Sequence, residues 1–189
     1  AANGKVPFCV IYSTFLQRAY DQLIHDVAIQ NLPVVFCVDR AGLVGEDGTT
    51  HHGVFDVAFL RSIPNLVILS PRNEQELINA MHWSVNNAKQ PIVIRYPRGK
   101  GVLEELKAPG LLELGKGEEL VKGKGIAIIS VGKMAQEVSQ AINLLNDQQI
   151  YPSHYDIRFI KPLDKTLLDN ISNSYTKLVI VEDGTITGG

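Results

Sequence analysis

An aromatic ring and a guanidinium lie three residues apart directly after the first apolar run of the chain. Phe15 and Arg18 project from one face if this segment begins a helix, because residues three apart are neighbours on a helix surface. Together they could stack on a flat heteroaromatic ligand and hydrogen-bond to it. The alternative is that Phe15 is a core residue and Arg18 a solvated helix residue, and spacing alone leaves both open.

A long loop follows the second apolar run, from Asp39 to Gly53, and holds four glycines, two histidines and several charges. Such loops inside compact domains are usually functional, glycine lets the backbone approach a ligand, and Asp47 with His51 supplies acid–base groups. We therefore predict an active-site loop. A metal site from Asp47, His51 and His52 and a plain polar surface loop are alternatives, although adjacent histidines on an irregular loop rarely bind one ion.

Two arginines follow neighbouring apolar runs. Arg98 lies between Pro97 and Gly99, so the turn that carries it is tightly specified, and Arg40 occupies the corresponding place after the second run. A planar guanidinium binds phosphate or carboxylate through two parallel hydrogen bonds, so the pair predicts an anionic ligand group. Two surface arginines in separate ion pairs are the alternative.

The elements that must position these side chains alternate apolar runs with helical periods. In the first half, strands are expected at 6–12, 33–38, 66–69 and 91–95, the first of them buried. A helix at 14–30 begins with Thr14-x-x-Gln17, the form of a capping box. A second helix, from about 73 to 87, is predicted to turn an apolar face inward, made of Leu77, Ile78, Met81 and Val85.

Strands separated by helices indicate parallel pairing, and continuous apolar strands indicate a sheet covered on both faces. Ligands of such sheets bind beyond the carboxyl ends of the strands, which is where the side chains above lie. After a predicted linker, a second α/β unit has strands at 126–131, 154–157 and 178–181 and helices at 134–145 and 164–171. Glu182 and Asp183 have no visible partner and are interpreted as part of a turn.

Composition excludes several classes of protein. Hydrophobic residues make up 45% and charged residues 20% of the 189 residues, with a formal net charge of −2, so the chain is neither disordered nor basic enough for nonspecific nucleic-acid binding. No run approaches the roughly 18 apolar residues of a membrane span. Cys9 and Cys37 lie in apolar runs and indicate buried thiols in a reducing, cytoplasmic setting. The chain begins without Met and stops at Gly189 soon after a strand, so we expect a piece of a longer polypeptide.

Long motifs of the chain resemble the 1-deoxy-D-xylulose-5-phosphate synthases, thiamine-diphosphate-dependent transferases of the transketolase type. These motifs are Tyr12-Ser-Thr-Phe15-Leu-Gln-Arg18-Ala-Tyr20-Asp21-Gln, His25-Asp26, Asp39-Arg40-Ala-Gly-Leu-Val-Gly-Glu-Asp47-Gly-x-Thr50-His51-x-Gly53-x-Phe55-Asp56, Arg95-Tyr96-Pro97-Arg98-Gly99 and Phe159-Ile-Lys161-Pro162-Leu163-Asp164. The resemblance covers nearly the whole chain. It implies an α/β fold with a parallel-sheet pyrimidine-binding domain at 1–105, a linker at 106–118 and part of a C-terminal α/β domain at 119–189.

The resemblance also implies an activity for the full-length protein. Such enzymes condense pyruvate with glyceraldehyde 3-phosphate, with loss of carbon dioxide, and the product feeds isoprenoid, thiamine and pyridoxal synthesis. Thiamine diphosphate carries the chemistry and is bound with magnesium by a diphosphate-binding domain that this chain lacks. A glutamate that contacts the cofactor's aminopyrimidine ring is expected before residue 1. We therefore expect a cytoplasmic homodimer at full length and no activity from this chain alone.

Five of the matching positions imply binding roles. Phe15 would stack on the aminopyrimidine ring of thiamine diphosphate, with Arg18 near it. Tyr12, Arg40 and Arg98 would hold the phosphate of the acceptor aldehyde.

Two further positions imply catalytic roles. Asp47 and His51 would face the hydroxyl and carbonyl of the acceptor and assist proton transfer, whereas His52 departs from the family's pattern and is given no role. Two alternatives remain: another enzyme of the transketolase type, such as transketolase itself or the beta component of an oxo-acid dehydrogenase, and a non-catalytic module that has kept the fold.

Overall fold

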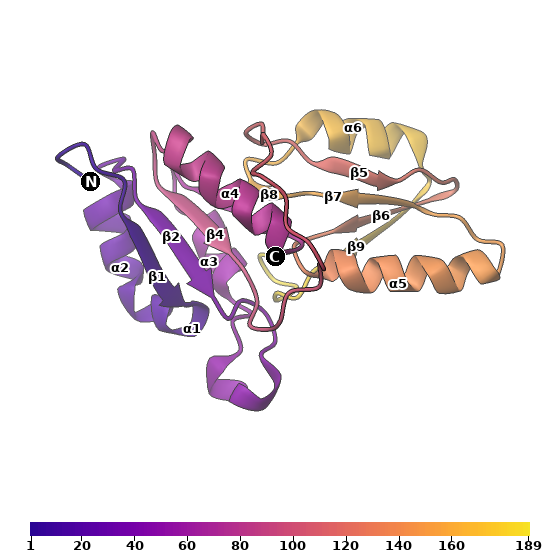
Figure 1. Cartoon of the computed structure of the whole chain (residues 1–189), viewed down its shortest axis with the longest axis horizontal. Helices are drawn as coiled ribbons and strands as arrows, with labels where there is room; N and C mark the ends of the chain where they lie inside the picture. Colours follow the sequence, from indigo (N-terminus) through magenta and orange to yellow (C-terminus); the bar gives the residue numbers. More distant parts are fainter.

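The computed structural model describes all residues from 1 to 189 and contains two β-sheets with flanking helices (Figure 1). The strands are β1 (Phe8–Tyr12), β2 (Val35–Asp39), β3 (Val67–Leu69), β4 (Ile92–Arg95), β5 (Glu118–Val121), β6 (Ile126–Ser130), β7 (Ser153–Asp156), β8 (Phe159–Lys161) and β9 (Lys177–Val181). The helices are α1 (Ser13–Leu16), α2 (Tyr20–Gln22), α3 (Asp56–Arg61), α4 (Glu74–Asn87), α5 (Met134–Asp147) and α6 (Lys165–Ser174). Short 3₁₀ turns lie at Gln17–Ala19, Gly45–Asp47 and Thr49–His51, and a π-helical segment lies at Leu23–Ala28.

The first sheet has the strand order β1-β2-β4-β3-β8, and its first four strands are parallel, as the alternation of strands and helices predicts. Its register pairs Tyr12 with Asp39 and Val38 with Arg95. The carboxyl ends of β1, β2 and β4 therefore meet at one edge of the sheet, where the predicted site residues follow them.

The fifth strand of this sheet comes from the second half of the chain. β8 pairs antiparallel with β3, with Ile68 opposite Lys161 and Leu69 opposite Phe159. The main hydrophobic core is continuous across both halves, because its 19 buried residues include Leu16 and Val57 as well as Ile129. The two α/β units are thus fastened together by a shared sheet and a shared core.

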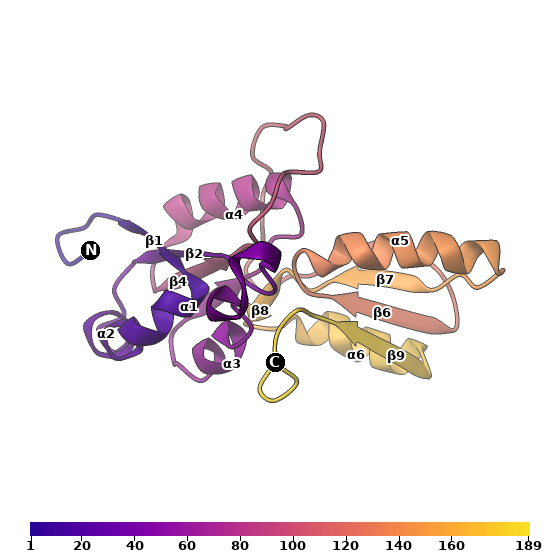
Figure 2. The same cartoon turned by 90° about the horizontal axis from the view of Figure 1, so that it is seen from below.

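The second sheet has the order β5-β7-β6-β9, and Figure 2 shows α5 and α6 on opposite sides of it. β6 is parallel to β7 and β9, whereas β5, which the sequence pattern did not predict, is antiparallel to β7. The predicted helices at 134–145 and 164–171 are confirmed, and the side chain of Asp164 caps α6 by accepting a hydrogen bond from the backbone N–H of Leu167 at 3.0 Å. No helix of the structure is long and apolar enough to cross a lipid bilayer.

The first helical region departs from the predicted regular helix at 14–30. It is a succession of α1, a 3₁₀ turn, α2 and the π segment. The prediction that Thr14 and Gln17 form a capping box is also wrong. The N-cap is Tyr12, which makes no side-chain cap, so Thr14 lies two positions inside the helix and its Oγ1 is buried without a partner. Short π segments are frequent at functional sites, and this one follows the residues predicted to bind a ligand.

The predicted inward face of α4 is right for Leu77, which packs against the core, but wrong for Met81 and Val85. Ala80 and Trp83 are buried, whereas Met81 and Val85 are exposed. The error has a physical cause, because the buried face carries polar residues that satisfy one another: the buried Asn79 donates to Glu76 at 3.2 Å, and Arg158 pairs with Glu76. Hydrophobic periodicity cannot identify a buried helix face whose polar residues pair with one another.

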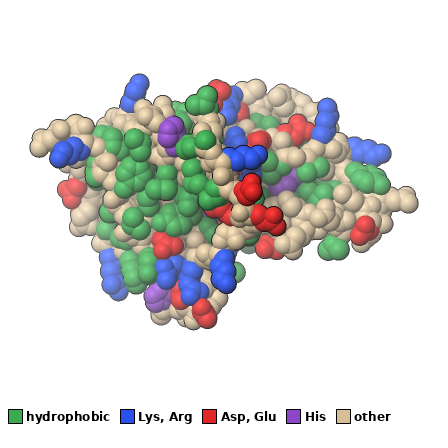
Figure 3. Space-filling model, viewed as in Figure 1, with side chains coloured by type: hydrophobic (Ala, Val, Ile, Leu, Met, Phe, Trp, Pro, Cys, Tyr) green, Lys and Arg blue, Asp and Glu red, His purple; other side chains and the backbone are tan.

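β1 is an exposed edge strand rather than the buried strand that its apolar run predicts. Phe8, Cys9 and Val10 are exposed, Val10 by 67%, so the predicted burial of Cys9 is wrong whereas that of Cys37 is confirmed. Phe8 and Val10 pair with Val35 and Cys37, which pack in the core cluster under α4, and the main contact of α4 with the sheet is to β4. The α4 side of the sheet is therefore uncovered at β1, and Figure 3 shows hydrophobic side chains gathered over this part of the molecule.

His154 in β7 predicts a pH dependence of stability. Its ring is fully buried, Nε2 lies 2.8 Å from Ser130 Oγ and Nδ1 has no partner. Burial, with a smaller effect of the nearby Arg72 charge, lowers the pKa of His154. The unfolded chain binds this proton below about pH 6.5 and the folded chain only at lower pH, so the free energy of unfolding falls as the pH drops below about 6.5, by at most about 1.4 kcal/mol per pH unit.

Urea titrations at about pH 7.5 and about pH 5.5 measure this loss. His154→Gln keeps a hydrogen-bonding group beside Ser130 and is expected to flatten the dependence. His82→Gln changes an exposed histidine that makes no ion pair and serves as the control. The prediction is contradicted if the free energy of unfolding changes equally with pH in the wild type and in His154→Gln.

Candidate active site

Two aromatic rings and a histidine meet where β1 runs into α1. The Tyr12 and Phe15 rings are stacked with their centroids 5.2 Å apart and their planes at 22°. His51, from the loop after β2, contacts the Phe15 ring edge-on, with the two ring centroids 5.6 Å apart. Phe15 is 41% exposed, so part of its ring is free to contact a ligand. The alternative prediction that Phe15 is a core residue is therefore wrong.

Arg40 connects these rings to the acidic part of the loop. Its guanidinium carbon lies 3.9 Å from the centroid of the Tyr12 ring, a cation–π contact. Its Nε donates to Asp47 Oδ2 at 2.8 Å and its Nη1 to Asp39 Oδ2 at 3.0 Å. Its backbone has a φ of +56°, a left-handed conformation that is uncommon outside glycine and is frequent at functional sites.

Arg98 approaches the same carboxylate from the turn after β4. Its Nε lies 3.4 Å from Asp47 Oδ2, and its Nη2 donates to Glu46 Oε1 at 2.9 Å. The hydrogen bond from Arg40 holds the pKa of Asp47 below its usual range, and the charges of Arg98, Arg40 and His51 add to this lowering. Asp47 is therefore ionised at neutral pH and accepts hydrogen bonds or protons rather than donating them. Two guanidinium groups that converge on one carboxylate are also placed to bind a phosphate.

Six of the seven predicted residues thus form one chain of contacts, and one does not. The connected residues run in the order His51, Phe15, Tyr12, Arg40, Asp47 and Arg98. Arg18 is exposed, and its side chain makes no hydrogen bond or ion pair. The two histidines of the loop differ: Thr50 Oγ1 lies 3.0 Å from Nδ1 of His51, whereas Nδ1 of His52 accepts from the backbone N–H of Val44 at 3.2 Å. The structure has no group of three or more His, Cys, Asp or Glu residues that could hold a metal ion.

The base of the loop is closed by paired glycines. The backbone N–H groups of Gly42 and Gly53 each donate to the carbonyl oxygen of the other at 2.8 Å. A Cβ added to Gly53 would lie 2.4 Å from the Arg40 carbonyl oxygen and 2.5 Å from Ser13, so only glycine fits there. We call this glycine pair the neck; it holds the segment 43–52, which carries Asp47 and His51.

One side chain that the sequence analysis missed reaches this region from the second sheet. Asp183, predicted to belong to a turn without a partner, accepts a hydrogen bond from Nη1 of Arg95 at 2.9 Å, and Arg95 Nε donates to Asp56 at 3.0 Å. The prediction was therefore wrong. Asp183 follows the carboxyl end of β9, the same kind of position that identified the other residues, but its partner lies 88 residues away in sequence.

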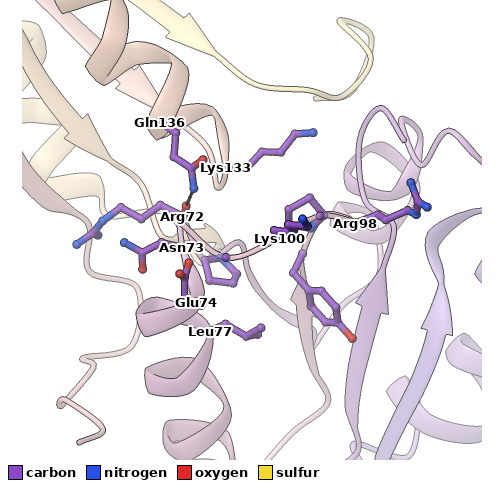
Figure 4. Close-up of a pocket in the computed structure, with 13 residues that line it drawn as sticks. Arg72, Asn73, Glu74, Leu77, Arg98, Lys100, Lys133 and Gln136 are labelled. Carbon is purple, nitrogen blue, oxygen red and sulfur yellow. Dashed lines mark hydrogen bonds between the residues drawn. The ribbon is translucent and has the colours of Figure 1, made fainter. Parts of the chain in front are cut away.

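A cavity of about 220 Å³ lies behind Arg98, where the two halves of the chain meet (Figure 4). Arg72 and Glu74 border it from the start of α4, Lys133 and Gln136 from the start of α5, and Lys100 from the turn after β4. In Figure 4 the Arg98 side chain points away from Lys133 and Gln136. The guanidinium of Arg98 therefore faces the acidic loop rather than this cavity.

Comparisons with known proteins identify the family of the chain. The family described as "Transketolase, pyrimidine binding domain" matches residues 1–102, and the one described as "Transketolase, C-terminal domain" matches residues 115–189. The 1-deoxy-D-xylulose-5-phosphate synthase of Bacteroides thetaiotaomicron is 54% identical over 191 residues, and that of Parabacteroides distasonis is 50% identical over 190 residues. Both alignments cover 100% of this chain but 30% of the relative, so the chain spans less than a third of their length.

Solved structures share the fold. A chain described as "Split gene transketolase, inactive beta4 tetramer" has a TM-score of 0.87 at 25% identity, covering 100% of this chain and 61% of that chain. A Pichia stipitis transketolase, solved in complex with sedoheptulose 7-phosphate, has a TM-score of 0.76 at 18% identity, covering 96% of this chain and 27% of that chain. At that identity the second likeness concerns the fold alone.

Proposed function

The chain belongs to the transketolase family, and we propose that it is the pyrimidine-binding and C-terminal part of a 1-deoxy-D-xylulose-5-phosphate synthase. The full-length protein would condense pyruvate with glyceraldehyde 3-phosphate, with loss of carbon dioxide, and so supply isoprenoid, thiamine and pyridoxal synthesis. The observation that carries the proposal is the continuous chain of contacts from His51 to Arg98 at the sheet edge. Identity of 50–54% to curated synthases along the whole chain favours this activity over those of other transketolase-type enzymes.

Thiamine diphosphate fits the aromatic end of the site. The partly exposed Phe15 ring, supported from behind by Tyr12, offers a face on which the aminopyrimidine ring would stack. The cofactor, when bound with magnesium by a further domain, supplies the carbanion chemistry that removes carbon dioxide from pyruvate. Arg18 lies one helical turn beyond Phe15, is exposed on the continuation of α1, and is assigned to the same binding surface.

The acceptor aldehyde would bind at the cationic end. Arg40 and Arg98 carry the charge that a phosphate needs, and Tyr12 packs against Arg40 and orients its guanidinium. His51 contacts the edge of the Phe15 ring and lies close enough to Asp47 for its charge to lower the pKa of that carboxyl, so it can transfer a proton to or from the acceptor carbonyl. Asp47, ionised and held by two arginines, would accept a hydrogen bond from the acceptor hydroxyl and assist that transfer.

The assembly is proposed to be a homodimer in the cytoplasm. An uncovered apolar face on β1 and α4, with Val10, Met81 and Val85 exposed, is the kind of surface that a further domain or subunit covers. Cys9 and Cys37 are both free thiols, which suits a reducing compartment. Because the diphosphate-binding domain lies outside the chain, residues 1–189 alone are proposed to be inactive.

A product assay tests the activity. The full-length protein that contains this chain should form 1-deoxy-D-xylulose 5-phosphate from pyruvate and glyceraldehyde 3-phosphate when thiamine diphosphate and Mg²⁺ are present. Transfer of a two-carbon unit from a ketose phosphate instead would assign it to transketolase. Absence of both reactions together with no calorimetric binding of thiamine diphosphate would favour a non-catalytic module.

Phe15→Ala should weaken cofactor binding. Loss of one stacked ring is expected to raise the Kd of the full-length protein for thiamine diphosphate about tenfold, because ring stacking contributes about 0.5–1.5 kcal/mol beyond the buried area. Isothermal titration calorimetry measures the change. Phe55→Ala, which removes another exposed ring of the first domain, is the matched control and should leave the Kd unchanged. An unaltered Kd in Phe15→Ala contradicts the stacking role.

A further inference from the structure

A buried charge cluster joins the end of β9 to the end of β4. The Asp183 side chain is 6% exposed, and its Oδ1 accepts from Nη1 of Arg95, which is 3% exposed. Arg95 Nε donates to the fully buried Asp56 at the start of α3. Arg95 is the last residue of β4, three positions before Arg98. Asp183 therefore fixes the strand end from which the turn with Arg98 departs.

Asp183 also packs directly against the neck of the active-site loop. A Cβ added to Gly42 would lie 1.8 Å from Oδ2 of Asp183, so the carboxylate occupies the space that any other residue would need. Gly42 has a φ of +76°, which independently favours glycine. Because Gly42 pairs with Gly53, the Asp183 carboxylate packs against the base of the segment that carries Asp47 and His51.

Two more contacts from the second half of the chain reach both ends of this segment. Lys133 Nζ lies 3.8 Å from Asp183 Oδ2 and donates to the Leu43 carbonyl oxygen at 3.4 Å. Figure 4 shows the Lys133 side chain extending from the start of α5 toward the side of the cavity that carries Arg98 and Lys100. At the other end, the backbone N–H of Thr185 donates to the Val54 carbonyl oxygen at 3.0 Å.

We propose that Asp183 is a positioning residue for acceptor binding: it holds the loop with Asp47 and His51, and the turn with Arg98, in register across the domain junction. The inference rests on the proposed function and deepens it. None of the seven predicted site residues comes from the C-terminal domain, yet through Asp183 and Lys133 this domain sets the relative position of the groups at the cationic end. The Tyr12 and Phe15 rings are carried by β1 and α1 rather than by this loop, which meets them only through the edge of the His51 ring.

Asp183→Asn in the full-length protein tests the inference, because it keeps the side-chain volume and removes the charge. The KM for glyceraldehyde 3-phosphate is expected to rise about tenfold, since one charge-assisted hydrogen bond to Arg95 is weakened and the loop opens more often. The KM for pyruvate and the Kd for thiamine diphosphate should stay within about twofold of the wild type, because those ligands bind toward the aromatic end. Asp169→Asn changes an exposed carboxylate on α6 and should alter none of these constants.

Hydrogen exchange followed by mass spectrometry adds a readout that does not need the reaction. Amides of residues 42–53 in Asp183→Asn should exchange about tenfold faster than in the wild type, while amides of β6 and α5 keep their rates. An unchanged acceptor KM with unchanged loop exchange overturns the inference. The inference is also overturned if hydrogen exchange rises equally in both domains and the KM values for pyruvate and acceptor rise equally. That result would indicate a general structural role for Asp183.

A second variant covers the case in which Asp183→Asn does not fold. Lys133→Gln removes the partly exposed contact to Leu43 and leaves the Arg95 pair intact, and a smaller, equally selective rise in loop exchange is expected. Absence of that rise overturns the inference. A wild-type protein that forms no product from pyruvate and glyceraldehyde 3-phosphate refutes the proposed function instead, and the exchange data remain a separate measure of the contact.

Discussion

Replacing Arg98 with alanine should lower kcat/KM for glyceraldehyde 3-phosphate by about 30- to 800-fold in the full-length enzyme, which corresponds to roughly 2–4 kcal/mol of lost hydrogen bonding to a charged group. Most of the loss should be in the acceptor KM, because Arg98 is proposed to bind the phosphate in the ground state as well as in the transition state. In the free chain the guanidinium pairs with Glu46 and Asp47, so the group is already oriented toward the loop.

Steady-state kinetics with pyruvate held at saturation measure this effect. Lys100→Ala removes a positive charge two residues away and should change the acceptor KM by no more than about threefold, because its charge is screened at the surface. Arg98→Lys keeps the charge but loses the planar fork and should recover only part of the activity. An acceptor KM in Arg98→Ala equal to that of the wild type would remove Arg98 from the phosphate site.

The second large effect concerns stability. Arg95→Ala is expected to lower the free energy of unfolding by about 3–5 kcal/mol, because it leaves two buried carboxylates, those of Asp56 and Asp183, without their shared cation. Burial alone would lower the pKa of Arg95, but the two carboxylates overcome this effect and raise the pKa above its ordinary value. That balance indicates that the buried cation is held by its partners.

Chemical denaturation with urea or guanidinium measures the loss. Lys122→Ala removes an exposed cation at the end of β5 and should change the free energy of unfolding by less than about 0.5 kcal/mol. Asp56→Asn should cost less than Arg95→Ala, since Arg95 then keeps the carboxylate of Asp183. Equal stabilities of the wild type and Arg95→Ala would show that the cluster contributes nothing to folding.

Much of the site could be predicted from sequence because of one topological regularity. Parallel strands end at the same edge, so the polar side chains after β1, β2 and β4 had to come together whatever the details of the loops. Tyr12, Arg40 and Arg98 are placed in this way. The spacing of Phe15 and Arg18 left open whether each is exposed, because it places them on one helix face without saying whether that face packs on the sheet.

The features that escaped prediction depend on contacts between distant parts of the chain. Asp183 finds its partner 88 residues away, and the polar residues of the inward face of α4 are satisfied by Arg158, 82 residues away from Glu76. Local patterns carry no information about such pairs. β8, only three residues long and paired with β3, escaped for the same reason.

The pairing of β3 with β8 has a consequence for biosynthesis. Leu69 leaves the ribosome 90 residues before its partner Phe159. At a translation rate of roughly 5–20 residues per second, the outer edge of β3 lacks its neighbouring strand for on the order of 5–20 s. During that interval the nascent chain carries an open strand edge, which can bind a chaperone or pair with another nascent chain through the same backbone groups. Synonymous codons that slow translation between positions 70 and 158 should therefore increase aggregation of the newly made protein, even though the finished molecule is unchanged.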